Sequence, residues 1–212
     1  MNRLIFITGG ARSGKSTFAE DLAKEINNSY PDKKLIAYIA TGEGMDEEFK
    51  TRIEEHQKRR GSEFLTLEEP LDIGSKVEFA YPNHSVIIVE CLTTWLANMY
   101  WKDPELKDMR VKSNTQNMIS LFTEKLDPVK KIESVKSFLT NNQNLSTEKL
   151  FENENLRDKT LIVVSNEIGQ GVVPDNKMSR DFRDDLGAVN KKMALNAHYV
   201  FHCVSGIPTR IK

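Results

Sequence analysis

A glycine-rich segment near the start of the chain has the residue types and spacing that bind nucleotide phosphates. Gly9 and Gly14 enclose four residues and are followed by Lys15 and Ser16, which is the pattern G-x-x-x-x-G-K-[ST]. In this pattern the backbone N–H groups of the loop surround the phosphates, the lysine reaches the β- and γ-phosphates, and the serine hydroxyl binds Mg²⁺. Lys15 is therefore a predicted catalytic residue and Ser16 a predicted metal ligand. The predicted nucleotide contacts in the loop are Gly9, Gly10, Ala11, Arg12, Ser13, Gly14, Lys15 and Ser16.

The elements on either side of this loop are the ones that the motif requires. Residues 4–7 form a short apolar run typical of a strand, and residues 16–26 place Phe18, Leu22 and Ile26 on one face of a predicted helix. The start of that helix offers free N–H groups and a positive dipole end to an anion. A chance glycine-rich turn would not need this context, so we predict that the chain binds a nucleoside triphosphate.

Two further apolar runs end in residues suited to such a site. Residues 35–40 predict a buried strand that leads into Thr41 and Gly42. The carboxyl ends of parallel strands face the ligand crevice of an open sheet, so Ala40, Thr41 and Gly42 are expected on the same side as the phosphate loop.

The second run, residues 85–90, closes on Glu90 in the form of a Walker B strand. Glu90 is expected to bind Mg²⁺ directly or through a neighbouring group. The alternative is an exposed carboxylate at a strand end.

A charged segment, residues 46–60, predicts a helix with acidic residues in its first turn and basic residues in its last. His56 lies on its apolar face, where a histidine is commonly structural. Lys58, Arg59 and Arg60 follow within one turn and could bind phosphate, or they could compensate the helix dipole in solvent. Their positive field would favour the neutral, nucleophilic imidazole of His56.

The whole pattern predicts an α/β single-domain P-loop NTPase-like fold, with a mostly parallel sheet and helices on both faces. We expect one domain over residues 1–212, with a polar helical insertion at about 102–159. The other elements are expected at 64–67 (strand), 71–80 (helix), from 94 (helix), 160–167 (strand), from about 180 to 198 (helix) and 200–204 (strand).

The composition of the chain bears on its partners, its cysteine chemistry and its cellular compartment. A formal net charge of −1 over 212 residues does not indicate a nucleic acid partner. Cys91 and Cys203 lie in apolar stretches, which favours small buried thiols over a disulfide or metal site. With neither a secretion signal nor an apolar run of about 18 residues, we expect a cytoplasmic protein without a membrane span.

Taken together, the motifs resemble those of the bifunctional adenosylcobinamide kinase / adenosylcobinamide-phosphate guanylyltransferase family of cobalamin biosynthesis. The similar stretches span nearly the whole chain in order, and two of them, 9–16 and 166–174, are specific to this family. The matching stretches are residues 8–16, 38–41, 52–56, 90–94, 165–174 and 182–190.

The resemblance implies two reactions with ATP and GTP as substrates. The first phosphorylates the hydroxyl of the aminopropanol arm of adenosylcobinamide, and the second transfers GMP from GTP to adenosylcobinamide phosphate. His56 matches the histidine that carries the guanylyl group. The residues after it are more basic than the family pattern. The resemblance also implies a homotrimer, Mg²⁺ ligation by Ser16 and Glu90, and further nucleotide contacts at Ala40, Thr41, Gly42, Gln57, Lys58, Arg59, Arg60, Glu68 and Glu90.

Two other functions remain open from the sequence. A P-loop small-molecule kinase without transferase activity would leave His56 structural. A slow GTP-hydrolysing switch is disfavoured because the guanine-reading pattern Asn-Lys-x-Asp is absent: the Asn-Lys pairs at 176–177 and 190–191 both lack the aspartate.

Overall fold

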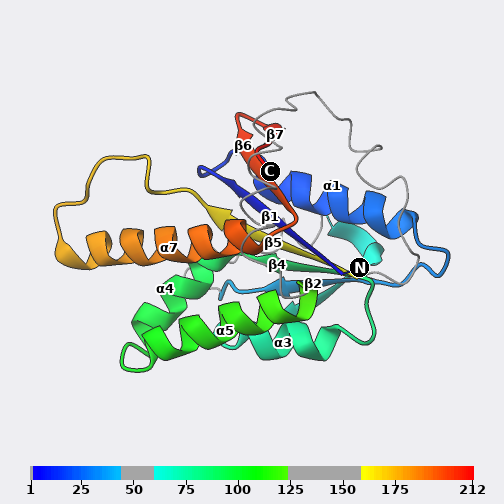
Figure 1. Cartoon of the computed structure of the whole chain (residues 1–212), viewed down its shortest axis with the longest axis horizontal. Coiled ribbons are helices and arrows are strands. Elements are labelled where there is room, and N and C mark those ends of the chain that lie inside the picture. Colours follow the sequence, from blue (N-terminus) through cyan, green and yellow to red (C-terminus); the bar gives the residue numbers. More distant parts are fainter. Residues whose placement is uncertain (1, 44–59, 124–158) are drawn as a thin grey trace, which may run out of the picture.

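The computed structural model describes residues 2–43, 60–123 and 159–212. Helices cover a seven-stranded sheet on both faces, and α4 and α7 extend beyond the carboxyl ends of its parallel strands (Figure 1). The strands are β1 (Arg3–Gly9), β2 (Ile36–Ala40), β3 (Phe64–Glu68), β4 (Val86–Glu90), β5 (Thr160–Asn166), β6 (Tyr199–Val204) and β7 (Ile207–Arg210). The helices are α1 (Lys15–Asn28), the short 3-10 helix η1 (Gly61–Glu63), α3 (Ile73–Ala80), α4 (Leu92–Lys102), α5 (Lys107–Phe122) and α7 (Lys177–Asn196).

The strand order is β3-β2-β4-β5-β1-β6-β7. All neighbouring strands are parallel except β6 and β7, which form an antiparallel hairpin. The central strands are continuous apolar runs because helices bury both of their faces, as parallel sheets require.

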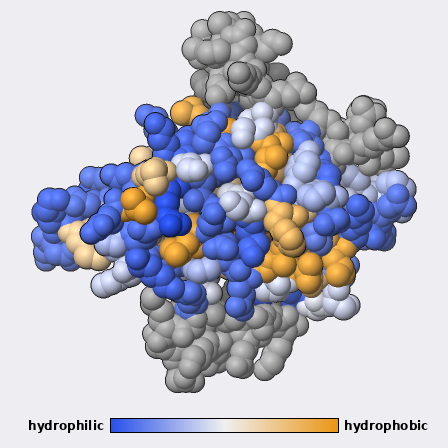
Figure 2. All heavy atoms as spheres, turned by 90° about the horizontal axis from the view of Figure 1, so that it is seen from below, coloured by the Kyte–Doolittle hydropathy of each residue, from blue (hydrophilic) through white to orange (hydrophobic). Residues whose placement is uncertain are grey.

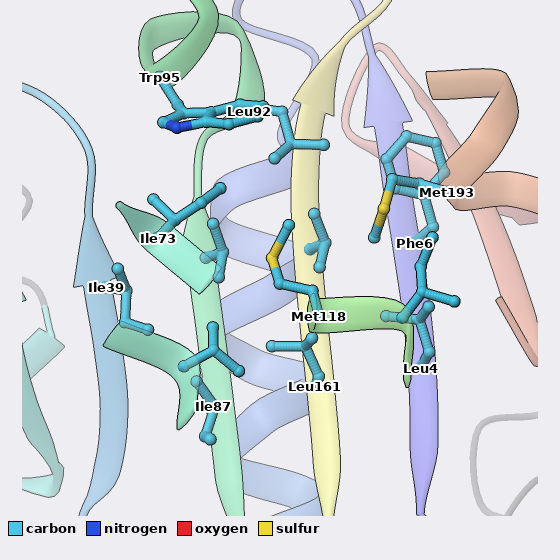
Figure 3. Close-up of a cluster of buried hydrophobic side chains, with 14 of the residues drawn as sticks. Leu4, Phe6, Ile39, Ile73, Ile87, Leu92, Trp95, Met118, Leu161 and Met193 are labelled. Carbon is cyan, nitrogen blue, oxygen red and sulfur yellow. The ribbon is translucent and has the colours of Figure 1, made fainter. Parts of the chain in front are cut away.

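Alternate side chains of each strand enter two different hydrophobic clusters. Ile5 and Ile7 of β1 pack with α1, whereas Leu4 and Phe6 pack on the opposite face with α3, α4, α5 and α7 (Figure 3). This alternation follows from the two-residue period of a strand. The predicted fold class, a mostly parallel α/β sheet with helices on both faces, is confirmed.

The last strand was missed by sequence reasoning. β6 and β7 are joined by Ser205 and Gly206, whose φ angles are 50° and 83°. A two-residue loop with positive φ at both positions matches the right-handed twist of a hairpin. The Ser-Gly pair between apolar residues was the available signal, but Pro208 argued against a strand and is tolerated only because β7 lies at the sheet edge.

The segment expected to be a polar insertion contributes to the core where it is described. Met118, Ile119 and Phe122 of α5 are buried in the same cluster as the sheet. Residues 124–158, and the helix expected over 46–60, lie outside the described residues. The boundaries of an insertion therefore stay a prediction.

Both cysteines are buried and free, as predicted. Burial raises the pKa of the Cys91 and Cys203 thiols, which keeps them protonated and unreactive at neutral pH.

On the face that carries α3 and α5, exposed hydrophobic side chains form separate groups among hydrophilic ones (Figure 2). Within the described ranges, no helix combines the length and hydrophobicity needed to cross a membrane.

His198 should make stability depend on pH. The backbone N–H of Leu4 donates to His198 Nδ1 at 3.0 Å, and burial together with the charge of Lys212 lowers the pKa of His198 below its usual value near 6.5. The neutral ring is therefore favoured in the folded state. Its stabilising contribution is complete above pH 6.5 and is lost as the pH falls through the lower pKa of the folded protein.

We expect the free energy of unfolding, measured with urea at a series of pH values, to decrease below pH 6.5. The His198→Asn variant keeps a hydrogen-bond acceptor near the position of Nδ1. In this variant, the part of the decrease that is caused by protonation of His198 should vanish. An unchanged pH profile in the variant would assign the acid sensitivity to other groups.

Candidate active site

The predicted phosphate loop connects β1 to α1 and is preorganised by its backbone. Gly14 has a φ of 86°, a conformation that glycine adopts without strain, and it immediately precedes the first residue of α1. Lys15 is 7% exposed, and its Nζ donates to the carbonyl oxygen of Gly10 at 3.2 Å. The ammonium group therefore already lies against the loop that would surround the phosphates.

The turn between β6 and β7 packs against the backbone of this loop. The N–H of Gly206 donates to the carbonyl oxygen of Ser13 at 3.0 Å. A Cβ at Gly14 would lie 3.0 Å from the Gly206 Cα, and a Cβ at Gly9 would lie 2.5 Å from the carbonyl oxygen of Cys203. Both loop glycines are thus required by close backbone contact with the hairpin.

Ser16 and Glu90, the two predicted metal ligands, meet at the carboxyl edge of the sheet. The Ser16 hydroxyl donates to Glu90 Oε1 at 2.7 Å, which joins the first turn of α1 to the end of β4. A hydroxyl and a carboxylate are the hard oxygen donors that Mg²⁺ prefers, and Mg²⁺ at a nucleotide commonly uses only one or two protein groups. The residues present therefore fit the ion.

Thr41 holds the end of β2 against the segment that follows Glu90. Its hydroxyl accepts from the Cys91 N–H at 2.8 Å and lies 2.9 Å from the Cys91 carbonyl oxygen, and its own N–H donates to the Glu90 carbonyl. Asn98 of α4, which is buried, donates to the Thr41 carbonyl at 2.8 Å. The Thr41 hydroxyl thus positions the Glu90 strand end, and the predicted contact of Thr41 with nucleotide stays a prediction.

We expect Thr41→Val to destabilise the protein by about 1–3 kcal/mol, because the buried Cys91 N–H loses its acceptor. Urea unfolding measures this change. Thr41→Ser, which keeps the hydroxyl, should recover most of the loss, and Thr209→Val on the exposed face of β7 is the matched control. Equal stability of Thr41→Val and Thr209→Val would contradict the positioning role.

Arg60 is buried rather than open to solvent, with 4% of its surface exposed. Its guanidinium lies 3.7 Å from the centre of the Tyr38 ring. Burial raises the pKa of Tyr38, the nearby carboxylates of Glu90 and Glu20 raise it further, and Arg60 opposes them. Arg60 thus lies buried against Tyr38 of β2, the strand whose last residue, Ala40, is in register with Glu90.

The remaining predicted nucleotide contacts lie along the carboxyl edge of the sheet, progressively further from the phosphate loop. Glu90, Ala40 and Glu68 are in register on β4, β2 and β3, and Gly42 follows β2. Glu68 is exposed and lies four strands from β1, roughly 19 Å at the usual strand spacing. The structure therefore brings Ser16 and Glu90 together with the phosphate loop and places Glu68 apart from it.

The residues that hold the end of β5 beside the phosphate loop lie in stretches that match the family, but the sequence assigned them no role in the site. The N–H of Asn166 donates to the Thr93 hydroxyl at 2.9 Å, and Asn190 donates to the Asn166 carbonyl at 3.0 Å. The N–H of Glu167 donates to the carbonyl of Gly9. The first two contacts come from α4 and α7, so only the packed helices reveal them.

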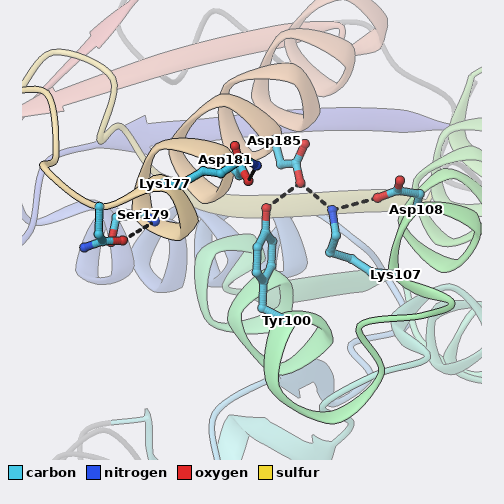
Figure 4. A network of polar contacts seen from close by, with 8 residues as sticks. Tyr100, Lys107, Asp108, Lys177, Ser179, Asp181 and Asp185 are labelled. Carbon is cyan, nitrogen blue, oxygen red and sulfur yellow. Dashed lines mark hydrogen bonds and ion pairs between the residues drawn. The ribbon is translucent and has the colours of Figure 1, made fainter.

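A polar network joins α4, α5 and α7 (Figure 4). Asp185 accepts from the Tyr100 hydroxyl at 2.6 Å and from Lys107 Nζ at 2.5 Å. Burial raises the pKa of Tyr100 to about 12, and its hydrogen bond to Asp185 adds to this effect. For Asp185, the hydrogen bonds outweigh burial and lower the pKa, so the carboxylate stays charged.

His56, Gln57, Lys58 and Arg59 lie outside the described residues. The guanylyl carrier and three of the predicted nucleotide contacts therefore remain predictions from the sequence.

The fold and the loop define the class of the protein, an α/β P-loop nucleotide-binding protein. The model of a family described as cobinamide kinase / cobinamide phosphate guanyltransferase matches residues 5–211. The chain therefore belongs to this family, which confirms the resemblance seen in the sequence motifs.

Curated relatives agree with this assignment over nearly their full length. The bifunctional adenosylcobalamin biosynthesis protein CobU of Escherichia coli K12 is 29% identical, with 99% of each chain covered. The protein of the same name from Salmonella typhimurium LT2 is 30% identical, again with 99% of each covered. The bifunctional adenosylcobalamin biosynthesis protein CobP of Pseudomonas aeruginosa is 32% identical over 97% of this chain and 95% of its own.

Proposed function

We propose that the protein is a bifunctional enzyme of cobalamin biosynthesis that phosphorylates adenosylcobinamide and then transfers GMP from GTP to adenosylcobinamide phosphate. The observation that carries this proposal is the Ser16–Glu90 contact beside a complete phosphate loop, in a chain that the family model matches over residues 5–211. The products are adenosylcobinamide-GDP and pyrophosphate.

In the kinase reaction, the phosphate loop binds the triphosphate of ATP or GTP. The loop N–H groups and Lys15 stabilise the charge that develops on the transferred phosphoryl group. Ser16 and Glu90 would hold Mg²⁺, which neutralises charge on the phosphate oxygens when bound.

In the transferase reaction, the neutral imidazole of His56 attacks the α-phosphorus of GTP. An N–P bond forms, the bond from the α-phosphorus to the bridging oxygen breaks, and pyrophosphate leaves. A phosphate oxygen of adenosylcobinamide phosphate then attacks the same phosphorus, the N–P bond breaks, and His56 is released. A covalent intermediate splits one difficult transfer into two displacements.

The test is transfer of label from GTP labelled at the α-phosphate to the protein in the presence of Mg²⁺. We expect acid-labile, base-stable label on the wild type and on a His84→Asn control, and none on His56→Ala. Retained kinase activity in His56→Ala would show that the variant is folded. Absence of label on the wild type would leave a P-loop kinase without transferase activity.

We also propose, from the resemblance, that three chains associate as a homotrimer in the cytoplasm. Light scattering during size-exclusion chromatography should then give a mass about three times the 24.2 kDa of one chain. A mass of one or two chains would overturn this proposal without affecting the labelling test.

A further inference from the structure

A cavity of about 250 Å³ lies between α5 and α7, in the helical layer on the face of the sheet opposite α1. Each helix contributes one stripe of side chains to its walls. The lining includes Val111, Lys112 and Thr115 of α5 and Ala188, Val189 and Lys192 of α7.

The charges at one end of the cavity are already balanced. Lys107 Nζ lies 2.5 Å from Asp185 and 2.6 Å from Asp108, as Figure 4 shows. These hydrogen bonds outweigh burial and raise the pKa of Lys107, so its ammonium group is fixed in this network. This end offers no free cation to a ligand.

The other end carries two lysines, Lys112 and Lys192. Among residues 2–43, 60–123 and 159–212, no carboxylate forms an ion pair with Lys112 or Lys192. Lys192 is half-buried, and burial together with the charge of Lys112 lowers its pKa. The two ammonium groups therefore destabilise each other, and an anion between them would relieve this repulsion.

Lys192 is also held in place. Its Nζ donates to the Thr115 hydroxyl at 3.1 Å, and that hydroxyl, 1% exposed, donates to the Val111 carbonyl at 2.7 Å. An ammonium group has three N–H donors, so this contact leaves two for a ligand. The buried threonine thus orients a cation toward the cavity.

Apolar surface from Val111, Ala188 and Val189 completes the walls. The cavity is smaller than the 300–1,000 Å³ typical of drug-sized ligands. We propose that it binds a small organic anion whose phosphate or carboxylate group accepts hydrogen bonds from Lys112 and Lys192, at a site separate from the phosphate loop.

Methyl NMR can test this site and the phosphate loop in one sample, because each has its own alanine. Ala188 reports on the cavity, and Ala11, which is exposed in the loop, reports on the nucleotide site. The full-length protein is titrated with inorganic phosphate and, separately, with propionate. The same titrations are run on a Lys112→Gln/Lys192→Gln double variant and on Lys191→Gln, an exposed neighbour on α7 that does not line the cavity.

We expect saturable shifts of the Ala188 methyl in the wild type and in Lys191→Gln, with binding at least about tenfold weaker in the double variant, because hydrogen bonds to charged groups are lost. Shifts of Ala11 with phosphate should be equal in all three proteins. A response to phosphate alone assigns a phosphate ligand, and a response to propionate alone assigns a carboxylate.

The proposal is overturned if Ala188 responds to neither anion at concentrations that saturate Ala11, or if the double variant binds as well as the wild type. The single variant Lys112→Gln changes an exposed side chain. It serves as the decisive comparison if the double variant does not fold.

Discussion

Replacing Lys15 with alanine is expected to lower kcat/KM by about 10²–10³-fold in the kinase reaction, the loss typical of one preorganised charge-stabilising donor. The Lys15 ammonium is buried against the phosphate loop and donates to Gly10. No other described lysine of α1 occupies the loop, since Lys24 lies more than two turns further along and pairs with Glu63 at 3.8 Å. Steady-state kinetics with adenosylcobinamide and ATP measures the effect.

Lys24→Ala is the matched control for Lys15→Ala, because it removes the same side chain from the same helix away from the loop. Its kinetics should equal those of the wild type. Lys15→Arg should recover little activity, since a planar guanidinium does not replace a compact ammonium group in a closely packed loop. If Lys15→Ala retains more than a third of the wild-type kcat/KM, the phosphate loop is not the kinase site.

Replacing Glu90 with glutamine is expected to raise the Mg²⁺ concentration needed for half-maximal activity by about 10–100-fold, the usual effect of removing a group that ligates or orients a metal ligand. Glutamine keeps the size of the side chain and loses the charge. The Ser16 hydroxyl donates to this carboxylate at 2.7 Å, so the two groups should act as a unit. Activity measured across a Mg²⁺ titration gives the result.

The coupling can be measured with Ser16→Ala and the double variant. Two independent sites would give additive changes in free energy, whereas groups in direct contact do not. We therefore expect the double variant to lose less than the sum of the two single losses. Glu78→Gln, an exposed carboxylate on α3, is the control. An unchanged Mg²⁺ titration for Glu90→Gln would contradict the metal assignment of Glu90.

Local sequence patterns predicted the phosphate loop and the strands that end beside it. The spacing of Gly9, Gly14, Lys15 and Ser16 predicted the loop because its function depends on consecutive residues. The continuous apolar runs that end at Ala40 and Glu90 predicted buried parallel strands for the same local reason. The structure then showed that Ser16 contacts Glu90, in keeping with the rule that parallel strands present their carboxyl ends at one edge.

By itself, the sequence determined the nucleotide loop, the strands that carry it and, through its motifs, the family. Only the tertiary structure showed that Gly206 supports Ser13 from about 190 residues away, that Thr41 positions the Glu90 strand end, and that Lys112 and Lys192 face one cavity. The reason is physical. Residue type and periodicity indicate how one segment forms its backbone hydrogen bonds and which of its faces is apolar. Which distant groups then meet depends on strand order and helix packing, which no local pattern contains.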